Sequence, residues 1–259
     1  MTVPAAPVPP TPAQHSAPPR RAMVLAAGLG LRMRPLTLNT PKPLIPVMGR
    51  TLLDRALDHL ERANVETAVV NTHYKGEMIA AHLAERTTPP AIILSPEETA
   101  LETGGGIKRA LPHLGADPFL AVNADILWLD GPVPAIQRMA DHWDPETMDA
   151  LLLLMSTTRA VGYEGLGDFQ MDPEGNLVRR EESRVAPFVY AGVQIVKPEL
   201  FGDSPDGAFS MNVLWDRAMA AGRLRGIAHD GLWYHVGTPA ALQETEGLLA
   251  MDGMRPFWP

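Results

Sequence analysis

The feature that most constrains the fold is a regular alternation of short apolar segments with amphipathic ones between residues 22 and 156. Segments such as 67–71 (TAVVN) and 149–156 (DALLLLMS) are apolar on both faces, which is typical of strands buried in a parallel sheet. Residues 51–64, in contrast, repeat leucine and alanine at helical spacing with charges on the opposite face. The alternation predicts an α/β fold, with a Rossmann-like, mostly parallel central sheet covered by helices on both faces.

The second half of the chain changes character. Strands are expected first at 22–27, 67–71, 91–95, 118–125 and 149–156, and helices at 51–64, 75–85, 105–111 (limited by Pro112) and 133–143. Beyond these, the sequence predicts a hairpin at 167–180, a strand at 188–196, a helix at 211–222, a strand pair at 224–237 and a terminal helix at 239–251. We expect this half to form a small β-rich lobe that packs onto the first.

Composition excludes several classes of protein. The net charge of −8 argues against sequence-independent nucleic-acid binding, which needs a basic face. With no cysteine, disulfides, thiolate catalysis and Cys-type zinc sites are excluded. No apolar run approaches the roughly 18 residues of a membrane span, and the Pro/Ala-rich residues 1–20 lack the apolar region of a secretory signal. We expect a disordered tail at 1–20 followed by a single domain at 21–255, in the cytoplasm and without nucleic-acid or membrane partners.

The loop after the first predicted strand carries the first functional signal. In VLAAGLGLRMRPLT (24–37), two glycines allow the backbone to approach a phosphate closely, and Arg32 and Arg34 add positive charge. A dinucleotide-binding turn requires a third glycine where Met33 stands, and no G-K-[ST] of a Walker A loop follows. The loop is therefore either an anion-binding nest of another kind or a glycine turn with two solvated arginines.

Two charged residues stand at positions suited to phosphate chemistry. Lys42 lies between two prolines that stiffen its loop, which fits a phosphate clamp as well as it fits a surface lysine in a turn. Asp125 ends the buried strand of 118–125. Ligands of open α/β sheets bind at the carboxyl ends of the strands, so the loop after Ala26, the segment after Ser95 and the strand end at Asp125 are the places to search.

Together these motifs resemble a known family. LAAGLGLRMRPLTLNTPKPLIPVMGRTLLD (25–54) is similar to the N-terminal signature of the sugar-1-phosphate nucleotidyltransferases, and the resemblance extends over most of residues 22–250. It implies that a sugar 1-phosphate and an NTP are converted to an NDP-sugar and pyrophosphate. Segments 95–112, 167–169 and 190–201 most resemble members that join UTP to N-acetylmuramate 1-phosphate in cell-wall recycling. The alternatives are a mannose-1-phosphate guanylyltransferase, a glucose-1-phosphate nucleotidyltransferase, or a non-catalytic nucleotide-binding module.

The resemblance also implies roles for individual residues. It divides the domain into a nucleotide half at about 21–130 and a sugar-binding half at about 131–255. Arg32 would contact the leaving pyrophosphate, Lys42 the reacting phosphates, and Asp125 a metal that bridges the two substrates. Nucleotide contacts are expected at Ala26, Ala27, Gly28, Gly30, Leu31, Arg32, Lys42, Thr103, Gly104 and Gly105, and sugar contacts at Gly167, Asp168, Glu181, Tyr190 and Gly192. Glu181 is alternatively one residue of a solvated charge run.

The expected metal site departs from the family pattern. Relatives carry an aspartate or asparagine two residues before a Gly-Thr pair, where this chain has His235. Mg2+ prefers oxygen ligands, whereas imidazole suits Mn2+, Co2+ or Zn2+. His235 therefore binds a softer ion, contacts phosphate directly or through a metal-bound water, or is structural. We expect Mg2+ as the cofactor, with Mn2+ or Co2+ as the alternative, and a monomer or homodimer as the assembly.

Overall fold

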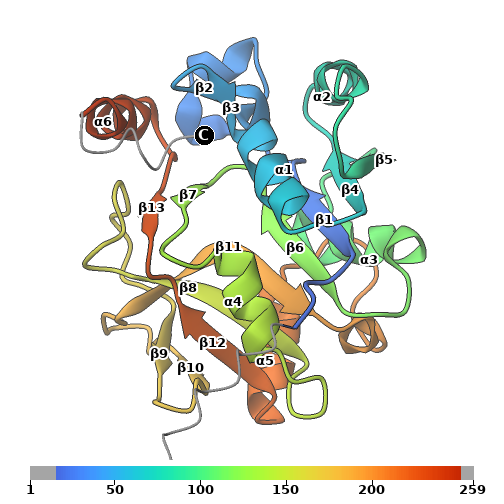
Figure 1. Ribbon diagram of the computed structural model, residues 1–259, viewed down its shortest axis with the longest axis vertical. Helices are drawn as coiled ribbons and strands as arrows, with labels where there is room; N and C mark the ends of the chain where they lie inside the picture. The colour runs from blue at the N-terminus through green and yellow to red at the C-terminus, as the bar shows by residue number, and fades with distance from the viewer. Residues whose placement is uncertain (1–15, 252–259) are drawn as a thin grey trace, which may run out of the picture.

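A nine-stranded sheet forms the centre of the computed structural model, which describes residues 16–251 (Figure 1). Its parallel part contains β6 (Phe119–Asn123), β1 (Arg21–Leu25), β4 (Thr67–Thr72) and β5 (Ala91–Pro96), side by side in that order. Next to β6, the antiparallel strand β11 (Phe188–Val196) also pairs with β8 (Ala150–Ser156) and β9 (Phe169–Met171). β5 is one edge of the sheet, and at the other side the outer strands are β10 (Leu177–Arg179), antiparallel to β9, and β12 (Leu224–Ala228), parallel to β8. The predicted α/β class and the 167–180 hairpin are confirmed.

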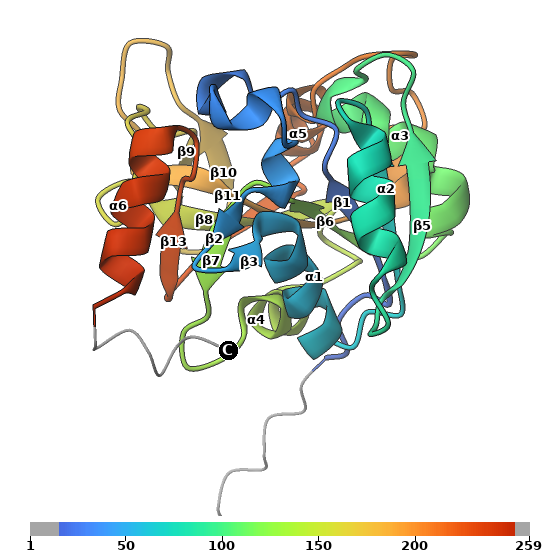
Figure 2. The same cartoon turned by 90° about the horizontal axis from the view of Figure 1, so that it is seen from above.

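Helices cover both faces of this sheet (Figure 2). Alternate residues of β1 explain why: Val24 joins one hydrophobic core and Met23 the other, so both sides of the strand are buried. The first core is closed by α1 (Leu52–Arg62), α2 (Gly76–Ala84) and α4 (Ala135–His142), and the second by α3 (Glu102–Leu114) and α5 (Asn212–Ala220).

The order of the strands creates a crevice beside β1. From β1 the chain moves outward to β4 and β5, and it then returns to place β6 on the other side of β1. Where the loops after two neighbouring parallel strands leave in opposite directions, a crevice opens between them. Sheets of this kind bind their ligands in that crevice. The carboxyl ends of β1 and β6, at Leu25 and Asn123, therefore position the functional site.

A second, two-stranded sheet lies outside the main one. Its strands are β7 (Leu127–Leu129), which the sequence did not predict, and β13 (Leu232–Tyr234). The predicted pairing within 224–237 is wrong, because β12 joins the main sheet through β8 while β13 pairs with β7. A third hydrophobic core packs these two strands against residues 33–52, including the ribbon of β2 (Pro46–Val47) and β3 (Arg50–Thr51), and against α6 (Pro239–Leu249).

Helix α3 also differs from the prediction. It begins at Glu102 rather than at residue 105, and Pro112 lies inside it instead of ending it. A proline removes one backbone donor and clashes with the preceding turn, but here only two helical residues follow it. The helix ends at Gly115, whose positive φ of 83° suits glycine.

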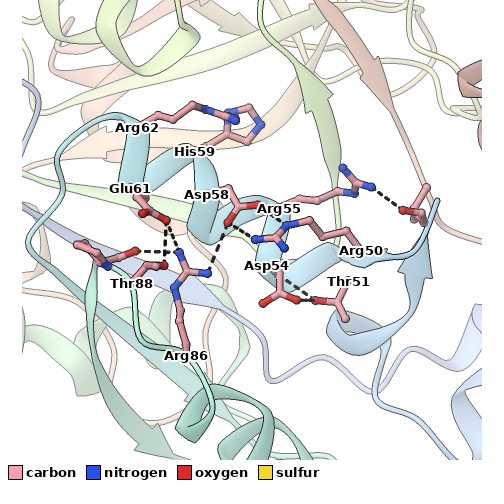
Figure 3. A network of polar contacts seen from close by, with 12 residues as sticks. Arg50, Thr51, Asp54, Arg55, Asp58, His59, Glu61, Arg62, Arg86 and Thr88 are labelled. Carbon is pink, nitrogen blue, oxygen red and sulfur yellow. Dashed lines mark hydrogen bonds and ion pairs between the residues drawn. The ribbon is translucent and has the colours of Figure 1, made fainter. Parts of the chain in front are cut away.

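Polar contacts fix α1 at both ends (Figure 3). Thr51 caps the first turn by accepting a hydrogen bond of 3.0 Å from the Asp54 N–H. Arg86, beyond α2, lies between Asp58 and Glu61 of α1 and pairs with both. Helix α1 packs against the segment that carries Lys42 and against β7. These polar contacts therefore fix the position of a helix that supports the functional site.

Asp130 anchors the far end of β7. Its carboxylate accepts hydrogen bonds from the Ala135 N–H (2.9 Å) and the Trp128 indole (3.2 Å), and it lies 3.2 Å from Nδ1 of His59. Burial raises the pKa of this carboxyl, but the contact with His59, the Ala135 N–H and the charge of Arg62 together lower it to about 2. The ionised carboxylate is thus a structural element of the folded protein.

We expect Asp130→Asn to lower the free energy of unfolding at pH 7 by on the order of 2 kcal/mol. The pKa is lower in the folded state than its ordinary value of 3.8, so the stabilisation is complete above that value and is lost as the pH falls toward about 2. Urea denaturation at several values between pH 7 and pH 3 measures the difference from the wild type. A difference that stays constant over this range would contradict the assignment.

The described part of the chain begins at Ser16, so residues 1–15 of the predicted tail, and residues 252–259, lie outside it. Ser16 is in contact with α4: its N–H donates to Asp141 (2.9 Å), and its carbonyl accepts from the Gln137 side chain (2.8 Å). Between residues 16 and 251, none of the helices combines the length and the apolar character needed to cross a bilayer.

Candidate active site

A cavity of about 520 Å3 opens at the carboxyl ends of β1, β4 and β6. It is lined by most of the residues predicted to contact the nucleotide: Ala26, Ala27, Gly28, Gly30, Leu31, Arg32, Lys42 and Thr103, together with Asp125. The structure therefore brings the glycine loop, the proline-flanked lysine and the strand-end aspartate to one place, at the crevice that the strand order creates.

The two glycines of the loop differ in why they are needed. Gly30 has a positive φ of 62°, and a Cβ there would lie only 3.0 Å from Cγ2 of Thr37. Its carbonyl also accepts a hydrogen bond of 2.8 Å from the Thr37 hydroxyl, so Gly30 is required by the loop itself. A Cβ at Gly28 would meet no atom within 4 Å. The space beside Gly28 belongs to the cavity, which leaves the backbone open to a ligand.

Lys42 and Asp125 form an ion pair inside the cavity. The Lys42 Nζ donates to Oδ2 of Asp125 at 2.8 Å, and the lysine side chain is 8% exposed while that of the aspartate is 42% exposed. The cation is therefore held in a fixed place in a low-dielectric setting, and the carboxylate keeps contact with the open cavity. Such a buried, oriented positive charge acts strongly on phosphate oxygens.

The small sheet places His235 near this pair. In the β7–β13 ladder, Tyr234 pairs with Leu127, so the residues that follow this rung at the same end are His235 and Ile126, and Ile126 is next to Asp125 in the chain. The imidazole lies over Gly237, where a Cβ would come within 2.5 Å of its Nε2, and Gly237 lines the cavity. A glycine two residues after the histidine is thus required for this position of the ring, although His235 itself is not among the residues that line the larger cavity.

Burial lowers the pKa of His235, and the positive charges of Lys42 and Arg32 lower it further. The negative charge of Asp125 acts in the opposite direction, but the net shift is downward. The imidazole is consequently neutral at pH 7 and has a lone pair available, which is the form that binds metal ions.

Gly104 and Gly105 do not line the cavity. Both lie in the first turn of α3, where their N–H groups donate to the carbonyl of Phe209 at 2.8 Å and 3.1 Å. A Cβ on Gly104 would come within 2.4 Å of the Phe209 ring, and one on Gly105 within 2.3 Å of the Gly207 carbonyl. These glycines allow a close approach of the 207–209 segment, while their neighbour Thr103 reaches the cavity.

Sequence reasoning missed four polar residues of the same cavity, Asn71, Glu97, Glu102 and Asn123, and the first two are joined by a hydrogen bond. Asn71 accepts from the Ala26 N–H (2.8 Å) and donates to Glu97 (2.7 Å), and Glu97 also accepts from the Leu101 N–H (3.0 Å). This chain of hydrogen bonds connects the ends of β1, β4 and β5 with the start of α3. The strand-end rule indicated the segment after Ser95, but no local motif distinguishes Glu97 from Glu98.

A second cavity, of about 280 Å3, adjoins the first and shares Leu25, Thr103 and Asn123 with it. Among the predicted sugar contacts, Asp168 and Tyr190 line it. Oδ2 of Asp168 accepts a hydrogen bond of 2.9 Å from the Tyr190 N–H. Burial raises the pKa of the Tyr190 hydroxyl far above its usual value, so the group remains a neutral hydrogen-bond donor. The sequence did not predict the other lining residues, Arg179, Gln194, Ser210, Met211, Asn212 and Trp215.

Gly167, Gly192 and Glu181 line neither of these two cavities. Gly167, at φ 79°, packs against the Ala186 carbonyl in a turn. Gly192, at φ 84°, forms the irregularity of β11, where a Cβ would meet Ile126 at 2.5 Å. The Glu181 carboxylate is exposed and pairs with Arg184 at 2.9 Å, as expected for a solvated charge run.

The sequence and the fold were compared with known proteins once this geometry was established. Residues 22–164 match the MobA-like NTP transferase domain. The chain is 48% identical to an N-acetylmuramate alpha-1-phosphate uridylyltransferase of Caulobacter vibrioides, over 90% of this chain and 98% of that protein. The chain belongs to the sugar-1-phosphate nucleotidyltransferases. A second relative with the same description, from Neisseria meningitidis, is 37% identical over 88% of this chain and 97% of its own length.

The fold of this nucleotidyltransferase agrees with that of a solved relative. HddC from Yersinia pseudotuberculosis, in a structure described as complexed with GMP-PN, superposes with a TM-score of 0.72 at 19% identity and covers 89% of this chain and 99% of its own. The nucleotidyltransferase fold predicted from the sequence is therefore confirmed. The chain is therefore an enzyme, a sugar-1-phosphate nucleotidyltransferase.

Proposed function

We propose that this enzyme transfers the uridylyl group of UTP to N-acetylmuramate 1-phosphate, forming UDP-N-acetylmuramate and pyrophosphate. The observation that carries the proposal is the pair of adjoining cavities, with the Lys42–Asp125 pair in the larger one. The identity of the substrates rests on the two uridylyltransferases that are 48% and 37% identical over nearly their whole length. Because UTP is a cytoplasmic nucleotide, the reaction is assigned to the cytoplasm.

The residues suit a direct displacement without a protein nucleophile. A phosphate oxygen of the sugar attacks the α-phosphorus of UTP, and the bond to the bridging oxygen breaks as pyrophosphate leaves. Lys42 holds the reacting phosphate oxygens, and Arg32, which lines the same cavity, contacts the leaving pyrophosphate. Catalysis then consists of positioning and charge stabilisation, as in other phosphoryl-type transfers.

Asp125 and His235 fit a divalent metal ion, which would neutralise phosphate charge when bound. Between residues 16 and 251 there is no group of three or more His, Asp or Glu side chains able to hold a metal by themselves. Phosphate oxygens and water would have to supply the remaining ligands, as is common for ions of this type. One carboxylate combined with one neutral imidazole favours Mn2+ or Co2+ over Mg2+.

We expect His235→Asp to raise the ratio of Mg2+-supported to Mn2+-supported turnover by about tenfold, because a carboxylate replaces the softer nitrogen ligand. Pyrophosphate release under each metal measures the ratio. His142→Asp, a change at an exposed residue at the end of α4, serves as the matched control. An unchanged ratio in His235→Asp would show that the imidazole is not a ligand.

A substrate panel tests the proposal as a whole. Each of four NTPs is combined with N-acetylmuramate, N-acetylglucosamine, glucose and mannose 1-phosphates, and pyrophosphate release is followed. We expect the highest kcat/KM for UTP with N-acetylmuramate 1-phosphate. A preference for GTP with mannose 1-phosphate, or for a glucose 1-phosphate reaction, would replace the proposed substrates, and no release with any pair would contradict turnover itself. Light scattering on the same preparation shows whether the protein is a monomer or a homodimer, the two assemblies that we expect.

A further inference from the structure

Two buried polar atoms, on residues that line the second cavity, make no hydrogen bond within residues 16–251: the hydroxyl of Tyr190, and Nη2 of Arg179, which is in ion-pair contact with Asp216. Both can donate a hydrogen bond. Leaving a buried donor unsatisfied costs about 1–3 kcal/mol, so such groups are uncommon in folded proteins without a reason. Two of them in one cavity indicate a ligand that supplies acceptor oxygens there.

Arg179 is held in a defined orientation at the end of β10. Its Nε donates to Oδ1 of Asp216 on α5 at 2.7 Å, and Nη2 lies 2.7 Å from the same oxygen without the direction of a hydrogen bond. Nη1 makes only a long contact of 3.4 Å to Oδ1 of Asn212. The guanidinium also lies 5.3 Å from the centre of the Phe169 ring. One edge of the planar fork is thus fixed by a single carboxylate oxygen, and on the Nη1–Nη2 edge the long bond from Nη1 to Asn212 is the one hydrogen bond made within the described residues.

Arg179 lies in a different cavity from Lys42 and Arg32, the cations that are proposed to bind phosphate. Lys42 and Arg32 line only the larger cavity, whereas Arg179 lines only the smaller one. Asp168, the acidic side chain of the smaller cavity, is already engaged by the Tyr190 N–H. A guanidinium fork matches the two oxygens of a carboxylate. The geometry therefore suits a sugar that carries a carboxylate in addition to its phosphate.

We propose that Arg179 binds the lactyl carboxylate of the sugar substrate and thereby selects N-acetylmuramate 1-phosphate over uncharged sugar 1-phosphates. Asp216 and Asn212 orient the guanidinium, and the Tyr190 hydroxyl donates to a further oxygen of the same sugar. This inference rests on the proposed function, because muramate differs from glucosamine by the lactyl ether that carries this carboxylate. Arg179 is then a specificity-determining residue, and its contribution is to sugar binding.

The test compares three sugars with UTP: N-acetylmuramate 1-phosphate, its lactamide analogue, and N-acetylglucosamine 1-phosphate. The lactamide keeps the shape of the lactyl group and removes its charge. The variants are Arg179→Gln, which removes the cation, and Arg179→Lys, which keeps the charge but not the fork. Arg225→Gln is the matched control, because Arg225 donates to the backbone carbonyls of Gly222 and Leu224 and lines neither cavity.

We expect the wild type and Arg225→Gln to prefer the acid over the lactamide by about 30-fold or more in kcat/KM. In Arg179→Gln the preference falls to about threefold or less, mainly through a higher KM for the acid, and Arg179→Lys lies between the two. Turnover of N-acetylglucosamine 1-phosphate stays within about threefold of the wild type in all variants. This last value also shows that each variant is folded.

Two results would contradict the inference in different ways. If Arg179→Gln lowers kcat/KM for the acid and the lactamide equally, Arg179 does not bind the carboxylate, although the proposed function stands. If the wild type uses N-acetylglucosamine 1-phosphate but not N-acetylmuramate 1-phosphate, the proposed function and the assignment of Arg179 are both wrong.

Discussion

Lys42→Ala is expected to lower kcat/KM by about 100- to 1,000-fold, the effect of removing one preorganised charge that stabilises a transition state. The lysine side chain is 8% exposed and donates to Asp125 at 2.8 Å, so its ammonium group does not have to be reorganised when the phosphates arrive. Steady-state pyrophosphate release with UTP and N-acetylmuramate 1-phosphate measures the loss.

The fold is expected to survive this change. The partner of Lys42, Asp125, has a side chain that is 42% exposed, so water can solvate its carboxylate in the variant. No buried charge is then left without compensation. Lys197→Ala is the matched control, because Lys197 pairs with Asp149 and donates to the Pro145 carbonyl beyond the end of β11. Near-normal turnover in Lys42→Ala, with both variants folded, would reject the role of Lys42 in phosphate binding.

Asp125→Asn is expected to have an effect of similar size, at least about 100-fold in turnover at fixed metal concentration. The amide keeps the shape of the side chain but lacks the charge that a divalent ion requires. We expect the metal concentration for half-maximal activity to rise as well. A titration of activity against Mg2+ and against Mn2+ measures both quantities, and full activity at ordinary metal concentrations would refute the metal assignment.

Asp130→Asn provides the control for this experiment, since it removes a carboxylate only five positions further along the chain. Asp130 lines neither cavity and serves the packing of β7 and α4. We therefore expect opposite results: Asp125→Asn loses turnover with little change in unfolding free energy, and Asp130→Asn loses stability with turnover at 25 °C within about threefold of the wild type.

Many lining residues of the larger cavity could be predicted because they are close in sequence and stand in recognisable local motifs. Gly28, Gly30 and Lys42 belong to one loop, and Asp125 ends a strand whose apolar character is plain. Strand order then brings the loop and the aspartate together. Here local patterns and the general topology of α/β sheets are enough.

The parts that sequence reasoning missed depend on contacts between distant segments. Gly104 and Gly105 suggested room for a base, but the space they leave is filled by the 207–209 segment, about a hundred residues away. The orientation of Arg179 depends on a contact with Asp216, which lies on α5, and β11 separates α5 from Arg179 in the chain. Strand β7 contains three residues, too few for a periodic signal, yet its ladder determines where His235 lies.

The β7–β13 ladder has a consequence for the synthesis of the protein on the ribosome. The last strand of the main sheet, β12, ends at Ala228, whereas β13 and α6 follow it. A nascent chain released only as far as β12 contains every strand of the nine-stranded sheet but lacks His235 and Gly237. We therefore expect a polypeptide that ends after β12 to have no turnover, because Gly237 of the larger cavity and the proposed metal ligand His235 are both missing from it.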